Sequence, residues 1–187
     1  MSQLPDLPVP ITSERDNDGR LVGLAFDSVP PPATPETNPW LVAVDGSDSA
    51  LRAVAHAAQQ AQTMNACALH LVHVQPWLSR EAAEAKLAHR AWLATERARA
   101  LLDAKGHPWR LHVVMGDVAE GILHLAGQLQ CSGIVIGSRG LGVTESLLLG
   151  SVASKLMHQS GPPLAVVPCT SPSSAGTRCP SPPPRPR

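Results

Sequence analysis

The sequence predicts an α/β protein, an open, doubly wound sheet of five parallel strands with helices on both faces. Two observations carry this prediction. Between residues 40 and 168, short apolar runs alternate with longer stretches of helix-forming residues, which is typical of strand–helix repeats. The short runs are apolar throughout rather than at every second position, as expected for strands that are buried on both faces. Right-handed crossovers between such strands give a parallel sheet.

The first half of this region predicts two strands, each followed by a helix. Residues 40–44 are a compact apolar run that ends in the turn Asp45-Gly46-Ser47. Residues 48–63 are rich in alanine and carry apolar residues at helical spacing. A second strand is expected over 66–74, and strong helix formers fill 79–105 until Gly106 stops the helix.

The second half predicts three more strands. Residues 109–114 form the third, and Asp117 with Glu120 makes a capping-box pattern that opens a helix to about residue 130. Residues 133–136 form a short, fully apolar fourth strand, followed by a glycine-rich loop and a helix to about residue 159. The fifth strand is expected over 163–167.

Both ends of the chain lie outside this alternation. Residues 1–39 are rich in Pro, Asp, Ser and Thr and are expected to form an extended, partly disordered extension, although the apolar patch 21–26 could add a strand. Residues 169–187 are rich in Pro and Ser and are expected to be a disordered tail. The domain is therefore predicted to span 40–168.

Composition excludes several classes of function. The 15 basic and 15 acidic residues balance, which argues against nucleic acid as a partner. The apolar runs are too short for a membrane helix, and the N-terminus has no signal-peptide pattern, so the cytoplasm is the expected compartment. The four cysteines show no C-x-x-C pair and are expected to be reduced thiols.

The ligand site of a doubly wound sheet lies outside the carboxyl ends of the strands, where the strand order reverses. The site is therefore expected to gather the residues that follow the first and fourth strands. These residues are Asp45, Gly46 and Ser47 after the first strand, and Gly137, Ser138, Arg139 and Gly140 after the fourth.

The segment after the fourth strand has the features of a phosphate site. Gly137 ends the strand, Gly140 allows a positive φ or a close backbone approach, and Gly150-Ser151 stands where the next helix should begin. A helix N-terminus offers free N–H donors to an anion, and Arg139 could add a guanidinium. The alternative is that these glycines only make turns. No Gly-Lys-Ser/Thr occurs, so the segment is not a P-loop.

The spacing Gly137-x-x-Gly140-(nine residues)-Gly150-Ser151 resembles the glycine signature of ATP-binding universal stress proteins. The segments 42–47, 70–74 and 163–168 are similar to the family's first, second and last strands. The resemblance covers about residues 40 to 168. It implies the adenine-nucleotide α-hydrolase-like fold with strand order 3-2-1-4-5, and ATP, with Mg²⁺ as an accompanying ion, as the ligand.

The resemblance also assigns roles to single residues. It implies that Asp45 lies near the ribose or adenine, and that Val74 and Ile136 are apolar neighbours of the base. The expected backbone and hydroxyl contacts to ribose and phosphates come from Gly137, Gly140, Gly150, Ser151 and Val152. Family members form dimers through the last strand, so residues 164–167 are expected to pair with a second copy.

Other constellations indicate little chemistry. His70 and His73 are three apart in a strand, so they point to opposite faces and are not expected to share a metal. No Gly-x-Ser-x-Gly elbow occurs, and Asp45 has no evident partner carboxylate. The sequence thus favours nucleotide binding in stress response or signalling with little or no turnover. The alternatives are a dimeric interaction protein that binds no nucleotide, and a weak ATP hydrolase.

Overall fold

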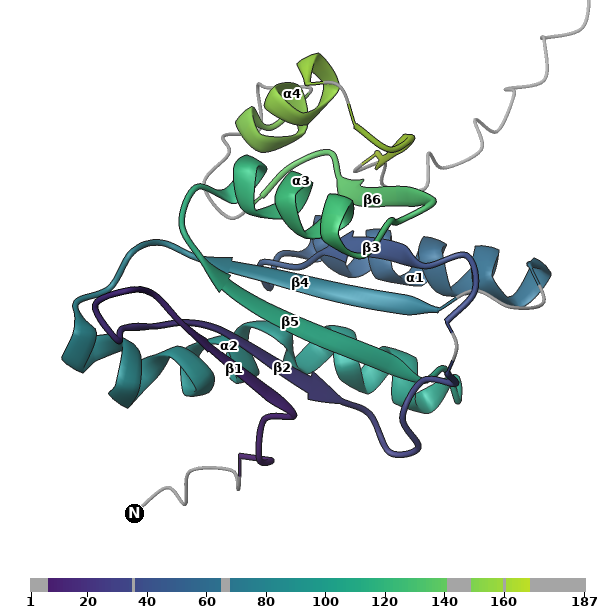
Figure 1. Cartoon of the computed structure of the whole chain (residues 1–187). Coiled ribbons are helices and arrows are strands. Elements are labelled where there is room, and N and C mark those ends of the chain that lie inside the picture. Colours follow the sequence, from purple (N-terminus) through teal and green to yellow (C-terminus); the bar gives the residue numbers. More distant parts are fainter. Residues whose placement is uncertain (1–6, 35, 65–67, 141–148, 160, 169–187) are drawn as a thin grey trace, which may run out of the picture.

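The structure is a computed structural model that describes residues 7–34, 36–64, 68–140, 149–159 and 161–168. Its strands form one seven-stranded sheet in the order β1-β2-β5-β4-β3-β6-β7 (Figure 1). The elements, in chain order, are β1 (Thr12–Arg15), β2 (Leu21–Asp27), β3 (Trp40–Ala43), α1 (Asp48–Thr63), β4 (Leu69–Gln75), α2 (Arg80–Ala104), β5 (Trp109–Met115), α3 (Val118–Gln128), β6 (Gly133–Gly137), α4 (Ser151–His158) and β7 (Leu164–Val167).

The five strands expected from the sequence are β3 to β7, and all of them pair in parallel. Their order, β5-β4-β3-β6-β7, is the expected 3-2-1-4-5. The chain runs outward from β3 to β5 on one side and then continues at β6 on the other side of β3. The strand order therefore reverses between β3 and β6, as the doubly wound prediction requires. The predicted fold class is confirmed.

The N-terminal region differs from the expectation of a loosely held extension. Residues 12–15 and 21–27 form a hairpin whose second strand, β2, pairs antiparallel with β5. The hairpin raises the strand count from five to seven. The physical reason is burial, because Leu24 and Phe26 of β2 belong to the main core. The sequence pattern of so short an apolar patch does not show which residues will pack against the patch. The tail 169–187 lies outside the described residues.

The helices cover both faces of the sheet (Figure 1), with α1 and α2 on one face and α3 and α4 on the other. Side chains cap the first three helices, as Ser47, Ser79 and Asp117 accept hydrogen bonds from backbone N–H groups in the first turns of α1, α2 and α3. Asp117 makes the N-cap half of the predicted capping box, since its Oδ1 accepts the N–H of Glu120 at 3.0 Å.

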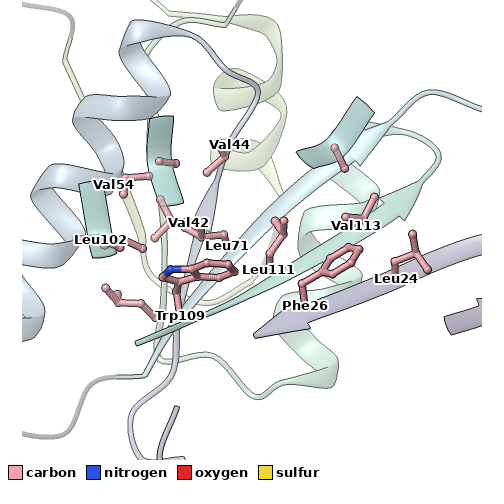
Figure 2. Packing of buried hydrophobic residues seen from close by; sticks show 14 of the residues in the cluster. Leu24, Phe26, Val42, Val44, Val54, Leu71, Leu102, Trp109, Leu111 and Val113 are labelled. Carbon is pink, nitrogen blue, oxygen red and sulfur yellow. The ribbon is translucent and has the colours of Figure 1, made fainter. Parts of the chain in front are cut away.

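The larger core lies between the sheet and the helices α1 and α2. Figure 2 shows that Phe26 of β2 and Trp109 and Leu111 of β5 gather with Val54 of α1 and Leu102 of α2. The rings of Phe26 and Trp92 lie 5.4 Å apart, so the hairpin packs directly on α2. A smaller core joins the other face of the sheet to α3 and α4. In the described part of the chain, no helix is long and apolar enough to cross a membrane.

Candidate functional site: a cavity at the strand switch point

A cavity of about 270 Å³ lies at the carboxyl ends of β3, β4 and β6, where the strand order reverses. Helices α3 and α4 form its other walls. Nine of the residues expected at the site line it, namely Asp45, Val74, Ile136, Gly137, Arg139, Gly140, Gly150, Ser151 and Val152. Residues far apart in the sequence, from 45 to 152, therefore meet in one concave site.

The three glycines of the series serve close approach rather than a positive φ. A Cβ on Gly137 would lie 2.4 Å from Oγ of Ser49, so β6 could not pack against the start of α1. A Cβ on Gly140 would lie 2.8 Å from Oδ2 of Asp45. A Cβ on Gly150 would lie 3.3 Å from the carbonyl oxygen of Ser138, whose partner is the N–H of Gly150 at 2.6 Å. The positive-φ alternative for Gly140 is thus not what the structure has.

Helix α4 begins at Ser151, and its N-terminus faces the cavity. Its N-cap residue is Gly150, and no side chain among the described residues caps it. The first N–H groups of an α-helix have no acceptor within the helix, so those of Ser151, Val152 and Ala153 depend on an external partner. All three residues line the cavity. The wall that they form suits an anion, since the helix dipole adds about half a positive charge there.

Arg139 brings a cation to the same cavity. Its backbone N–H donates to Oγ of Ser49 at 3.2 Å, which ties the loop after β6 to the start of α1. The Nε atom of its guanidinium is buried and has no hydrogen-bond partner in the described part of the protein. A buried, unpaired donor is costly, and an anionic ligand would satisfy it.

Three expected site residues do not line the cavity. Gly46 has a φ of +87°, and a Cβ at this position would lie 3.1 Å from the carbonyl oxygen of Ala94. Ser47 uses its hydroxyl to cap α1. Ser138 is buried, and its backbone N–H donates to the carbonyl oxygen of Val167 in β7. The structure gives all three a role in positioning the site.

Sequence reasoning missed the apolar walls of the cavity. These residues are Ala43, Val44, Ala50, Val72, Val118, Ile122 and Ala153. The strand residues belong to uniformly apolar runs, so the pattern does not show which of them face the cavity. Val118, Ile122 and Ala153 can be assigned to it only once the packing of α3 and α4 on the sheet is known. His73 helps to fix Val44 in this wall, because its buried Nδ1–H donates to the carbonyl oxygen of Val44 at 2.9 Å. Burial lowers the pKa of His73.

His70, His112 and Glu36 form a separate network toward the opposite end of the strands. His70 points away from His73, as the strand period predicts. Its Nδ1 lies 2.9 Å from Nε2 of His112, and its Nε2 lies 2.8 Å from the carboxylate of Glu36. Burial lowers the pKa of His70 and, with the charges of His70 and Arg110, lowers that of His112 to about 3. Within the described ranges no group of three or more His, Cys, Asp or Glu is placed to hold a metal.

The fold and the cavity together define a Rossmann-like α/β protein with a glycine-lined site at its switch point. The model of the universal stress protein family matches residues 37–168, so the chain belongs to that family. It is 35% identical over 132 residues to "Universal stress protein in QAH/OAS sulfhydrylase 3'region" from Thermus aquaticus, an alignment that covers 68% of this chain and 96% of that protein. The hairpin β1–β2 lies outside the region that the family model matches.

Solved structures share the same fold. A universal stress protein in complex with cAMP is 26% identical with a TM-score of 0.57, over 71% of this chain and 97% of that chain. A universal stress protein from Archaeoglobus fulgidus in complex with dAMP is 23% identical with a TM-score of 0.55, over 70% of this chain and 98% of that chain. The second likeness concerns the fold alone.

Proposed function

We propose that this chain binds an adenine nucleotide in the cavity at the β3–β6 switch point and acts in stress response or signalling. The observation that carries the proposal is the pairing of an uncapped helix N-terminus at Gly150 with the buried, unpartnered Nε of Arg139 in one cavity. A universal stress protein of the same fold is known in complex with cAMP. ATP with Mg²⁺ is the form that the glycine series implies.

The shape of the cavity supports a nucleotide rather than a free phosphate. The lining combines apolar side chains from β4 and α3, such as Val72, Val74 and Ile122, with the glycines and Arg139 from the loop after β6 and the start of α4. A ligand with an apolar ring at one end and an anion at the other fits this combination. Asp45 stands beside Gly140, in reach of hydroxyl groups between the two ends.

We propose that the site binds its nucleotide with little or no turnover. Among the described residues that line the cavity, Asp45 is the only carboxylate, Arg139 is the only cation, and none is a histidine. General acid–base catalysis needs a positioned base near the attacking water, and among the described lining residues Asp45 is the one carboxylate that offers itself, with no second acid or base beside it. A weak ATP hydrolase is the rival, and time-resolved detection of ADP or AMP from bound ATP separates the two. We expect none above the rate in buffer.

The proposal is tested by mass spectrometry of small molecules released from freshly purified protein, followed by calorimetric titration with AMP and ATP. We expect a co-purified adenine nucleotide, and a loss of affinity of about tenfold or more in Arg139→Gln, since a charge-assisted hydrogen bond contributes about 1.5–3 kcal/mol. Arg90→Gln, at an exposed position on α2, is the control. Wild-type protein that binds neither nucleotide would favour the alternative, an interaction protein that binds no nucleotide.

A second copy of the chain is proposed as the partner, through β7. This strand is at the edge of the sheet, and all four of its residues, Leu164–Val167, are half-buried. An apolar edge strand exposes unpaired backbone groups that a symmetry-related strand can satisfy. The cytoplasm is the expected compartment.

A further inference from the structure

Ser49, the second residue of α1, is buried next to the cavity without being one of its lining residues. Its side chain is 4% exposed, and a buried hydroxyl needs a hydrogen-bond partner. That partner is the backbone N–H of Arg139, which donates to Oγ of Ser49 at 3.2 Å. Because Arg139 does line the cavity, the hydroxyl of Ser49 can act on the site through Arg139.

This contact depends on the missing side chain of Gly137. A Cβ at that position would lie 2.4 Å from Oγ of Ser49 and 2.6 Å from its carbonyl carbon, which is closer than real Cβ atoms approach. Glycine at the end of β6 therefore lets the first turn of α1 reach the loop that follows β6. Gly137 leaves the space, and Ser49 places a hydrogen-bond acceptor in it.

Backbone hydrogen bonds hold the residue before Arg139 from two other directions. The N–H of Ser138 donates to the carbonyl oxygen of Val167 in β7 at 2.9 Å, and the carbonyl oxygen of Ser138 accepts the N–H of Gly150 at 2.6 Å. Ser49 adds a third anchor, from α1, at the residue that carries the charge. Since this anchor is a side chain, a substitution can remove it and leave the two backbone hydrogen bonds in place.

The anchor matters because an arginine side chain is long and flexible. Ordering such a side chain on binding costs conformational entropy, and a backbone that is already fixed reduces this cost. The Nε atom of Arg139 is buried and has no hydrogen-bond partner in the described part of the chain. The hydrogen bond to Ser49 keeps the backbone of Arg139 where its side chain lines the cavity.

We infer that Ser49 is a positioning residue for the anion-binding part of the cavity, whose hydroxyl holds Arg139 in place for the phosphate of the nucleotide. This inference rests on the proposed function. Loss of the hydroxyl should then weaken ligands that carry a phosphate group and leave the binding of the nucleoside alone unchanged.

The test is calorimetric titration of the full chain with AMP and with adenosine, the same ligand without its phosphate. We expect Ser49→Ala to weaken AMP binding about threefold or more and to change adenosine binding less than about twofold. Equal losses for the two ligands, or no loss for AMP, would overturn the inference and leave the proposed function standing. A wild-type protein that binds neither ligand would overturn both.

A double-mutant cycle with Arg139→Gln shows whether Ser49 acts through Arg139. In the Arg139→Gln background the guanidinium is gone, so Ser49→Ala should change the AMP affinity less than about twofold. A loss as large as in the wild-type background would mean that Ser49 acts by another route, and the inference would be wrong.

Two further variants separate positioning from packing. A thiol fills the space of the hydroxyl but accepts hydrogen bonds weakly, so Ser49→Cys should show the same selective loss, and it carries the test if Ser49→Ala does not fold. Wild-type AMP affinity in Ser49→Cys would assign the alanine result to lost packing and overturn the inference. Ser28→Ala is the matched control, because the buried Oγ of Ser28 also accepts a backbone N–H, that of Trp109 at 2.9 Å, at the amino end of β5. It should lower the stability in urea without changing the AMP affinity.

Discussion

At the scale of single residues, the glycine series has two physical functions at once. One is the proposed function of leaving backbone groups open to a ligand, and the other is to let three segments of chain pass close to one another. Gly137 shows the second function most clearly, because it lies against Ser49 at the start of α1. The glycine series, which resembles a ligand-binding motif, is therefore also needed for the close packing of β6 against α1.

Replacing Gly137 with alanine should destabilise the fold. The new Cβ would lie 2.4 Å from Oγ of Ser49 and 2.6 Å from its backbone, so α1 or β6 must shift. We expect a loss of about 1–3 kcal/mol in the free energy of unfolding, measured with urea. Gly127→Ala is the matched control, since this exposed glycine of α3 has nothing within 4 Å of its Cβ position and alanine is the better helix former. Equal stabilities of the two variants would contradict this account of Gly137.

The buried histidines predict a dependence of stability on pH. Burial lowers the pKa of His70 and His112 in the folded protein, that of His112 to about 3, whereas an unfolded histidine titrates near 6.5. The unfolded chain therefore takes up protons first as the pH falls. The stability is full above pH 6.5 and decreases below it, down to about pH 3 for His112, by at most about 1.4 kcal/mol per pH unit for each histidine.

This pH dependence can be measured by urea unfolding between pH 7.5 and 4.5. In His112→Gln the slope should be smaller, because one buried group that resists protonation is gone. His124→Gln, at an exposed position of α3, serves as the control. A slope in the His112 variant as steep as in the wild type would show that other groups cause the acid sensitivity.

At the scale of elements, the N-terminal hairpin is the main addition to the fold. It pairs with β5 through β2 and covers an edge that the family domain by itself would expose. Its other contacts reach α2, where Arg15 pairs with Glu84, and the loop before α2, where the guanidinium of Arg20 lies 5.7 Å from the Trp77 ring. The hairpin is thus part of the folded unit.

Phe26→Ala tests how firmly the hairpin is integrated. The side chain is 1% exposed and packs against Trp92, so the variant should lose about 3–5 kcal/mol of unfolding free energy. Val29→Ala, two residues after β2 and almost fully exposed, should stay within about 0.5 kcal/mol of the wild type. A loss below 1 kcal/mol for Phe26→Ala would mean that the hairpin is held loosely after all.

At the scale of the whole molecule, the two edges of the sheet differ. The edge strand β1 is exposed and polar, with the sequence Thr-Ser-Glu-Arg, whereas β7 is apolar and half-buried. Polar and charged residues protect an edge from pairing with other chains. The sheet therefore leaves β7 as the edge suited to a second copy.

Light scattering after size-exclusion chromatography measures the oligomeric state of the protein directly. We expect a mass of twice the 19.7 kDa chain for the wild type. Ala165→Lys should yield the monomer, because a two-fold pairing of β7 brings two ammonium groups close together, while Ser13→Lys on β1 should leave the dimer intact. A wild-type monomer at high micromolar concentration, or a dimer lost only in the β1 variant, would rule out β7 as the interface.

The sequence by itself determined the fold class, the starts of the helices and the place of the glycine series at the end of β6. These features follow from local information: apolar runs, capping residues such as Asp117, and turn residues such as Gly46. Only the tertiary structure showed that Phe26 has a core to enter, that His70 meets His112 and Glu36, and that Ser49 meets Arg139. The physical reason is that these contacts join segments distant in the chain, and their energy depends on what each side chain meets after folding.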